Sequence, residues 1–271
     1  MEHVLPTGQM HLVFRLSGAP LQLRPDGLGD PPLQTLHGPV IGGARSSFYI
    51  KRLGTPATSV GALLRPGAAR ALLAADASEL AERHTPLADI WGADASLASE
   101  QIASAVDPVT QLAMLARILL RRLTHHAALP ALAPDVQQAI AGLRQAQRVS
   151  DVVGHSGYSH RALLVRFRQA TGLTPKAWSQ VWRMQRVLDS LRTDPACSLA
   201  RLAADCGFSD QAHLNRAFRA FAGVTPPQYR QQSPRHRNHL PMPRAAGQIS
   251  SIQADRPVAT VPCHPSTRSP P

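Results

Sequence analysis

Residues 207–226 have the sequence GFSDQAHLNRAFRAFAGVTP, which is similar to the earlier segment GYSHRALLVRFRQATGLTP at residues 157–175. Both copies contain a Gly-aromatic-Ser phrase, then Phe-Arg, then Gly-x-Thr-Pro. A short segment with helical apolar spacing precedes each copy, Val149–His155 in the first and Leu199–Cys206 in the second. An internal repeat of this kind indicates that the chain contains one small helical unit twice.

Each copy has the features of a helix-turn-helix. Gly157 and Gly207 suit a tight turn, because glycine adopts a positive φ at no steric cost. Ser159 and Ser209 stand where a side chain can cap the next helix by accepting from its free backbone amides. That second helix carries an apolar pair at i, i+4 spacing in both copies: Leu163 with Phe167, and Leu214 with Phe218. A single match of this type is weak evidence, whereas two matches with the same internal pattern are strong.

The ends of the two units are duplicated as well. Gly172 and Gly223 are expected to end the second helices, and Pro175 and Pro226 to begin the helices that follow. An aromatic residue stands three positions beyond each proline: Trp178 in the first copy and Tyr229 in the second.

A single helix from Pro175 to about Arg192 is expected to join the two copies. Its apolar residues follow helical spacing: Trp178, Val181, Trp182, Leu188 and Leu191. At about 1.5 Å per residue this helix is about 25 Å long. It could therefore hold the two second helices near one DNA turn apart, roughly 34 Å, on one face of a duplex.

Length and charge indicate two domains of different kinds. The chain has 271 residues, of which 44% are hydrophobic, and a net charge of +12. Residues 1–133 carry 11 Lys and Arg against 10 Asp and Glu, residues 134–230 carry 13 against 6, and residues 231–271 carry 5 against 1. A basic helical region behind a nearly neutral one favours a nucleic-acid-binding module joined to a domain with another task.

We expect a domain boundary in the segment LPALAP, residues 129–134, where the charge balance changes. Residues 1–130 would form a regulatory, sensor or dimerisation domain, and residues 131–232 an all-α domain with the two helix-turn-helix motifs joined by the linker helix. Residues 233–271 are rich in Pro, Arg, Ser and His without periodicity, which predicts a disordered basic tail.

The first domain is expected to be α+β. Strands are predicted at 11–16, 46–53 and 58–64. Helices are predicted from Pro66 onward, with Pro66 at a first helical position, and from Asp107-Pro108 to about Leu123.

Several classes of protein and site are disfavoured. Cys197, Cys206 and Cys263 share no metal-ligand spacing and are too few for a disulfide framework, which favours a reducing compartment. The histidines have no partners at metal-binding spacing, and no Gly-rich phosphate loop or nucleophile elbow is present. Three arginines interrupt the most apolar run, Ala113–Leu123, so it cannot cross a bilayer. We expect a cytoplasmic, nucleoid-associated protein with no metal, no cofactor and no membrane partner.

The repeated phrases, read as Ile/Leu-Ala-x-x-x-Gly-Phe-Ser, Asn-Arg-Ala-Phe-Arg and Gly-Val-Thr-Pro-x-x-Tyr-Arg, resemble the DNA-binding module of the AraC/XylS family of bacterial transcription regulators. The resemblance covers residues 134 to about 232. It includes the unequal spacing of the two motifs, eight residues from Ser159 to Phe167 and nine from Ser209 to Phe218. It implies a sequence-specific DNA-binding regulator, with a lean toward activation through RNA polymerase.

The upstream segments HGPVIGGARSSFYI, GALLRPGAARALL and ERHTPLADIWG resemble a poorly characterised domain that precedes such modules in a subset of the family. In that subset more sequence often precedes the phrase VLPTGQMHLVF, which leaves open whether Met1 is the natural start.

Residues on the second helices that face away from the Leu/Phe stripes are the candidates for DNA contact. The first copy offers His160, Arg161, Leu164, Val165 and Arg168, and the second offers Asp210, Gln211, His213, Asn215 and Arg216. Gln and Asn can pair with adenine, and Arg with guanine or phosphate. Leu164 and Val165 depart from the family pattern, in which polar residues are common at these positions. Arg161 is then the best base reader of the first helix, and Leu164 would touch a thymine methyl group.

Two other functions stay open on these residues. A DNA-repair methyltransferase can carry this kind of helical module, although it needs a reactive cysteine, and an architectural protein would bind DNA through charge without sequence preference. Besides double-stranded DNA, the partners under consideration are RNA polymerase, a small-molecule effector and a second copy of the chain.

Overall fold

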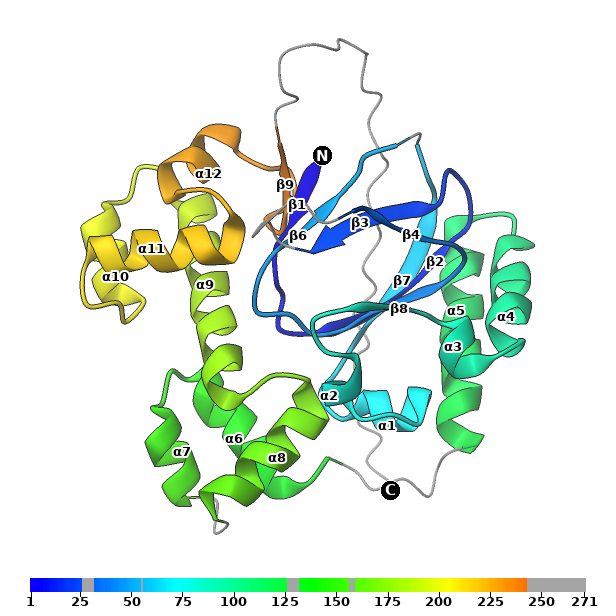
Figure 1. The fold of residues 1–271 in the computed structure, drawn as a ribbon, viewed down its shortest axis with the longest axis horizontal. Coiled ribbons are helices and arrows are strands. Elements are labelled where there is room, and N and C mark those ends of the chain that lie inside the picture. The colour runs from blue at the N-terminus through cyan, green and yellow to red at the C-terminus, as the bar shows by residue number, and fades with distance from the viewer. Residues whose placement is uncertain (26–31, 55, 126–131, 156–158, 243–271) are drawn as a thin grey trace, which may run out of the picture.

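A computed structural model describes residues 1–25, 32–54, 56–125, 132–155 and 159–242. Figure 1 shows a β-rich part on one side and a group of helices on the other, and the long helix α9 runs through this group of helices. The prediction of an α+β domain followed by an all-α domain with two helix-turn-helix motifs is confirmed.

The strands of the described residues form two antiparallel sheets, in the orders β4-β3-β6-β1-β9 and β7-β2-β5-β8. Their bounds are β1 Glu2–Val4, β2 Met10–Arg15, β3 Leu21–Pro25, β4 Gln34–Leu36, β5 Val40–Gly42, β6 Tyr49–Lys51, β7 Ser59–Leu64, β8 His84–Pro86 and β9 His239–Pro241. In β2 the even-numbered side chains, among them Leu12 and Phe14, are buried while the alternate ones are partly exposed. The predicted alternation therefore places this strand correctly.

In the described part of the first domain, five helices accompany the sheets: α1 Ala68–Leu73, α2 Ala77–Leu80, α3 Ala88–Trp91, α4 Asp94–Ala103 and α5 Pro108–His125. Asp107 caps α5, since its carboxylate accepts from the backbone N–H of Val109 at 2.8 Å and of Thr110 at 3.1 Å. The predicted cap-proline start of this helix is confirmed. The prediction for Pro66 is wrong, because α1 starts at Ala68 after Gly67, whose φ of 85° is left-handed.

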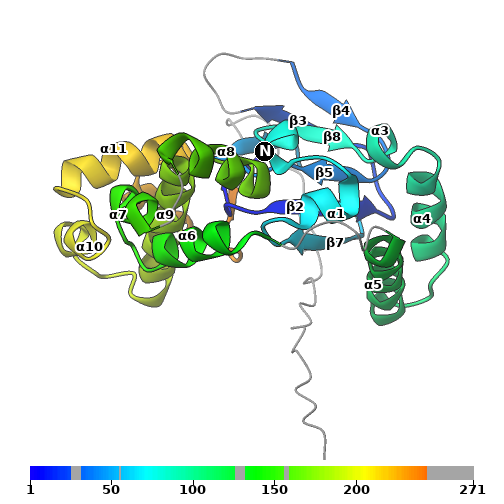
Figure 2. The ribbon, with the colours of Figure 1, turned by 90° about the horizontal axis from the view of Figure 1, so that it is seen from below.

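The helical module contains α6 Pro134–Arg144, α7 Val149–His155, α8 His160–Thr171, α9 Pro175–Thr193, α10 Leu199–Asp205, α11 Gln211–Ala222 and α12 Pro226–Gln232. These bounds give two helix pairs joined by a linker helix, in the predicted order. Figure 2 shows the module beside the sheets, with α5 at the opposite end of the molecule.

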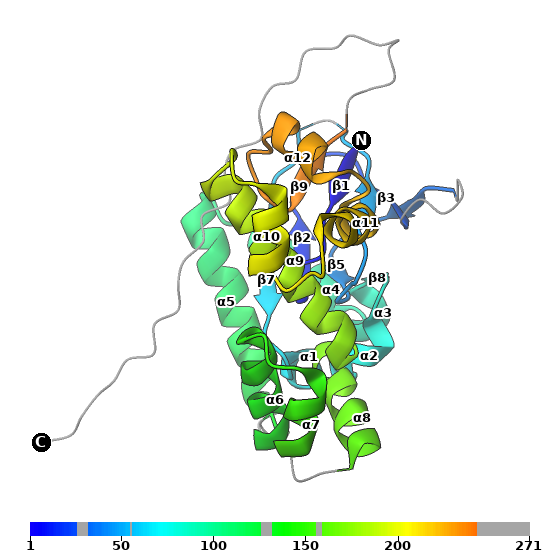
Figure 3. The same ribbon diagram turned by 90° about the vertical axis from the view of Figure 1, so that its left-hand side faces the viewer.

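The prediction of a disordered tail from Ser233 is wrong for residues 233–242. Strand β9 pairs antiparallel with β1, with Leu240 opposite His3, and Leu240 is fully buried. The last module helix is thus followed by a strand that returns to the first sheet, which Figure 3 shows beside α12. Residues 243–271 and the expected boundary at 130/131 lie outside the described residues.

One hydrophobic core runs through both parts of the chain. The same cluster of buried side chains contains Leu12 and Phe14 of the sheets, Trp178 and Leu188 of the linker helix, and Phe218 of the second helix-turn-helix. The two parts share buried apolar surface, so they are held together by the same force that folds each of them.

Candidate nucleic-acid interface

The two helix-turn-helix motifs have the same construction at their C-terminal ends. Gly172 and Gly223 end α8 and α11 in the left-handed region, with φ of 84° and 75°. The next helices are capped by threonine side chains and start with proline. An edge-to-face aromatic pair closes each unit: Phe167 and Trp178 have centroids 5.9 Å apart, and Phe218 and Tyr229 have centroids 5.7 Å apart.

We call α8 and α11, the second helices of the two motifs, the reading helices after the DNA contacts expected of them. Their starts differ. Ser159 caps α8 as predicted, accepting from the backbone N–H of Ala162 at 3.3 Å. The predicted cap Ser209 is wrong, because α11 is capped by Asp210, which accepts from the N–H of His213 at 2.6 Å. Ser209 donates instead to the Asp210 carboxylate at 3.0 Å. These hydrogen bonds, the one from the His213 amide first, hold the pKa of Asp210 below its ordinary value.

Most of the predicted contact residues lie on the open faces of α8 and α11. Exposed side chains belong to His160, Arg161, Val165, Arg168, Gln211 and Arg216, and partly exposed ones to Leu164, His213 and Asn215. The stripes that oppose them are fully buried: Leu163, Phe167, Leu214 and Phe218 each have 0% exposure. Each reading helix therefore has one face in the core and one face toward solvent, as a helix entering a groove requires.

Two residues of α11 have local partners that bear on their roles. The His213 ring lies edge-on to Phe208 at 5.3 Å, and its Nδ1 lies 3.1 Å from the Ser209 hydroxyl. His213 thus contributes to the turn of the motif whether or not it meets DNA. The Oδ1 atom of Asn215 is buried without a hydrogen-bond partner, so this amide has an unmet hydrogen-bonding capacity within the reading helix.

Basic residues that sequence reasoning did not rank hold the motifs in place. Arg166 of α8 makes two hydrogen bonds, of 2.9 and 3.0 Å, to the buried carboxylate of Asp135 in α6. Arg183 of the linker helix lies over the Phe208 ring at 5.3 Å, and Arg186 donates to the carbonyl of Asp205 at 3.2 Å. The linker helix is therefore attached to the second motif by both hydrogen bonding and stacking.

The first domain contacts the C-terminal end of α11. The His3 Nδ1–H donates to the carbonyl of Ala222 at 3.0 Å, and the His3 ring stacks on Phe48 at 4.3 Å. An ideal Cβ on Gly223 would lie 2.7 Å from both rings. Burial lowers the pKa of His3 and favours the neutral imidazole, while the hydrogen bond to the Ala222 carbonyl opposes this shift.

The first domain also contacts α8 and α9. The N–H of Gly67 donates to the carbonyl of Ala170 at 2.9 Å, and an ideal Cβ on Gly172 would lie 3.1 Å from Ala44 and from the carbonyl of Ala77. In the linker helix, buried Gln185 donates to the carbonyl of Pro6. Both reading helices and the helix between them therefore rest on one domain.

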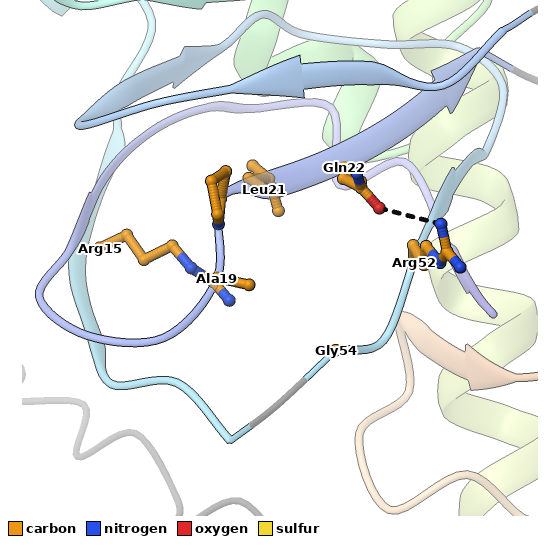
Figure 4. Close-up of a pocket in the computed structure, with 7 residues that line it drawn as sticks. Arg15, Ala19, Leu21, Gln22, Arg52 and Gly54 are labelled. Atoms are coloured by element: carbon orange, nitrogen blue, oxygen red, sulfur yellow. Dashed lines mark hydrogen bonds between the residues drawn. The ribbon is translucent and has the colours of Figure 1, made fainter.

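The cysteines and a small pocket bear on the alternative functions. Burial raises the pKa of the Cys206 thiol, and Cys197 is partly buried with its Sγ 3.0 Å from an Arg230 nitrogen; Cys263 lies outside the described residues. A pocket of about 130 Å³ lies near the end of β2 and the start of β3. Arg52 donates to Gln22 at 3.3 Å beside this pocket, as Figure 4 shows. The volume of the pocket is below the roughly 300–1,000 Å³ of sites for drug-sized ligands.

Comparison with known proteins finds a domain match in each part of the chain. A helix-turn-helix domain matches residues 136–232, and a domain of unknown function (DUF6597) matches residues 1–86. Over 64 residues the chain is 38% identical to the bifunctional transcriptional activator/DNA repair enzyme Ada of Escherichia coli (strain K12). That segment is 24% of this chain and 18% of Ada, so the chain matches less than a fifth of the length of this relative.

Two solved structures of ToxT from Vibrio cholerae are similar at a low level. Each is 11% identical, with a TM-score of 0.44, over 85% of this chain and 94% or 93% of ToxT. Separately, no helix in the described ranges combines the length and apolar character needed to span a membrane.

The duplicated motifs and the two domain matches agree with the sequence resemblance in both of its parts. Residues 136–232 therefore form an AraC-type helix-turn-helix domain with two such motifs, and this domain follows a domain of unknown function.

Proposed function

We propose that the protein is a sequence-specific transcriptional regulator that reads two successive major grooves of one DNA duplex, with α8 in one groove and α11 in the next. The observation that carries this proposal is the duplicated construction of the two motifs on one linker helix. Helix α9 has 19 residues, which is about 28 Å at about 1.5 Å per residue. This is close to the roughly 34 Å between equivalent grooves.

The open faces of the two helices have side chains for both kinds of DNA contact. Arg161 in α8 and Gln211 and Asn215 in α11 are the proposed base readers. The guanidinium of Arg161 can donate to the two acceptors of a guanine edge, and a side-chain amide can both donate to and accept from an adenine edge. His160, Arg168, His213 and Arg216 are proposed to contact phosphates or neighbouring bases, and Leu164 a thymine methyl group. Phosphate contacts would fix the register of the helices, while base contacts would give the sequence preference.

A regulator is favoured over a DNA-targeted enzyme. A repair methyltransferase needs a thiolate nucleophile, and thiolates occur where positive charge or a helix N-terminus lowers the thiol pKa. Cys206 has a raised pKa from burial instead. The similarity to Ada spans 18% of that protein, so its repair activity is not carried over to this chain.

The proposal is tested with the full chain and a library of random DNA duplexes. Selected sites should contain two short conserved blocks about one turn apart, and a footprint should cover two successive major grooves. Arg161→Ala and Asn215→Ala should each weaken binding to the selected site by about 1–3 kcal/mol and relax preference in different blocks. Gln180→Ala on the exposed side of α9 is the matched control.

Two outcomes would contradict the proposal. If both variants weakened random DNA as much as the selected site, their side chains would be phosphate contacts. If no sequence were enriched at fixed salt, the protein would be a nonspecific architectural binder. Contact with RNA polymerase, a small-molecule effector, a second copy of the chain and action at the nucleoid in the cytoplasm stay predictions.

A further inference from the structure

Residues 233–242 connect the helical module back to the first sheet, and we call this segment the strap. It follows α12 directly, because Ser233 ends that helix in the left-handed region with φ of 40°. Strand β9 lies within the strap, and Figures 1 and 3 both show it beside β1. The helix-turn-helix match ends at residue 232. The strap is therefore an addition to the two motifs, and their sequence pattern does not account for it.

On one side, the strap binds the linker helix and the last helix of the second motif. The Tyr229 hydroxyl of α12 donates to the carbonyl of Arg237 at 2.9 Å. The Arg237 guanidinium forms an ion pair with the carboxylate of Asp189 in α9. The side-chain amide of Gln185, which is 4% exposed, donates to Oδ1 of Asn238 at 2.9 Å. Two adjacent residues of the strap thus hold α9 and α12 together.

On the other side, the strap binds the N-terminal strand of the first domain. The backbone N–H of Leu5 donates to the carbonyl of Asn238 at 2.8 Å. Strand β9 pairs with β1, and its Leu240 has 0% exposure. The Glu2 carboxylate of β1 lies 3.2 Å from Nδ1 of His239. Asn238 therefore contacts both parts of the chain, α9 through its side chain and Leu5 through its carbonyl.

The first motif is attached to the first domain at a different place. Helix α8 packs against α2, and the N–H of Gly67 donates to the carbonyl of Ala170 near the end of α8. If the strap were released, β1 would become an edge strand of its sheet, and the contact of His3 with Ala222 would lose support. Release of the strap should therefore loosen the second motif while the first motif stays in place.

The strap leaves the DNA-facing sides of the motifs open. Arg161 of α8 and Gln211 and Arg216 of α11 are exposed with the strap in place. An autoinhibitory segment that covered these side chains would bury them. Their exposure favours a positioning role for the strap over an inhibitory one.

We propose that the strap positions the second motif for DNA, with Asn238 and Leu240 as its positioning residues. This inference rests on the proposed function, in which α8 and α11 enter successive grooves. Two linked binding units strengthen each other only when their geometry allows both to bind at once. The strap holds α11 in one orientation relative to α8 before DNA is met, so this ordering does not subtract from the binding free energy. Without the strap, the groove that α11 enters should be lost first.

Full-length variants and two DNA duplexes test this proposal. One duplex carries the selected site, and in the other the base block for α11 is replaced by random sequence, so that it reports on the first motif. Asn238→Leu removes the acceptor for the Gln185 amide. This variant should bind the selected site at least about tenfold more weakly and bind the second duplex with unchanged affinity. Its footprint should keep the α8 groove and lose the α11 groove.

Three other variants complete the design. Asn238→Asp keeps an acceptor for the Gln185 amide and should bind as the natural protein does. Gln231→Leu makes an equivalent change at an exposed position of α12, and as the matched control it should keep both grooves. Leu240→Asp places a charge at a buried position and should give the same footprint as Asn238→Leu. Where Leu240→Asp does not fold, Asn238→Leu decides the test.

Several results would overturn the inference. If Asn238→Leu kept both grooves, the strap would not position α11, and if it lost both grooves equally, the strap would only stabilise the fold. A higher affinity of Asn238→Leu for the selected site would make the strap inhibitory. Loss of the α11 groove in Asn238→Asp as well would overturn the role of the hydrogen bond. The proposed function fails if the natural protein does not protect two grooves, whereas the strap inference alone fails if the natural protein and Asn238→Leu both protect them.

Discussion

Alanine substitutions at two glycines of the second motif can measure how firmly the first domain holds the reading helix α11. Gly207 and Gly223 have the same φ of 75°, and both lie in the same helix-turn-helix. An ideal Cβ on Gly207 has nothing within 4 Å, whereas a Cβ on Gly223 would lie 2.7 Å from the rings of His3 and Phe48. Substituting each by alanine therefore separates backbone strain from the contact between the domains.

The expected costs follow from these distances. A left-handed conformation costs an L-residue about 1–2 kcal/mol, and this applies equally to Gly207→Ala and Gly223→Ala. The second change also overpacks a contact in which His3 is fixed by its hydrogen bond to Ala222 and by stacking on Phe48. Overpacking typically adds about 1–3 kcal/mol. We expect Gly223→Ala to lower the free energy of unfolding by about 2–5 kcal/mol in total.

Urea unfolding of the full-length variants measures the difference. Placing both substitutions in a His3→Ala background completes the test, because removing the imidazole should reduce the extra cost of Gly223→Ala and leave the cost of Gly207→Ala unchanged. Equal losses of stability for the two alanine variants in the natural background would refute the reasoning. They would mean that α11 is not held against His3 and Phe48 in solution.

Three further predictions concern pH, the helix cap and the C-terminal segment. Burial lowers the pKa of His11 to about 4 and of His84 to about 3, so the unfolded chain binds protons first as the pH falls below about 6.5. Stability should be full above that pH and should drop by about 2–3 kcal/mol in total between pH 7.5 and 5.5, as urea midpoints would show; a flat profile would exclude neutral burial of both rings. Asp210→Ala should lower the free energy of unfolding by about 1 kcal/mol because the α11 cap is removed, and Ser209→Ala should lower it by less. If calorimetry gave the reverse order, Ser209 would be the cap. Residues 243–271 hold three Arg and one Asp. Deleting them should reduce the slope of log binding constant against log salt concentration by about 0.9 for each phosphate that the segment neutralises, and should leave the ratio of specific to random affinity unchanged. A changed ratio would show that the segment reads sequence.

The helical module could be predicted closely because its signals are local. Thr174-Pro175 and Thr225-Pro226 begin helices, and Gly172 and Gly223 end them, so a few adjacent residues define each boundary. Ser209 and Asp210 are adjacent, and both residue types are common helix caps. In the structure the extended backbone at Asp210 makes this residue the cap, and its carboxylate accepts from the N–H of His213. A sequence pattern does not distinguish between two adjacent residues that can both cap a helix.

The sheets were harder to predict because their pairing is distant. Strands β1, β4, β5, β8 and β9 have three residues each, which is too short for an alternating pattern to be recognised. The equally short β6 lies within the strand predicted at 46–53. His239–Pro241 gave no sign of a strand, since its partner Glu2–Val4 lies at the other end of the chain. The contacts of His3 with Ala222 and of Gly67 with Ala170 have no local signature either, so sequence reasoning missed how the first domain meets both reading helices.

The structural inequality of the two motifs bears on how the chain would choose its DNA. In α8 one arginine, Arg166, is committed to Asp135 inside the module, and the neighbouring Val165 is 51% exposed with no polar side-chain atom. In α11 the open face presents Gln211, Asn215 and Arg216, and the start of the helix is fixed by Asp210. Bidentate polar pairs discriminate bases by about 1–3 kcal/mol each. We therefore expect the groove that α11 enters to contribute more of the sequence preference, and the groove that α8 enters to depend on Arg161 and on shape.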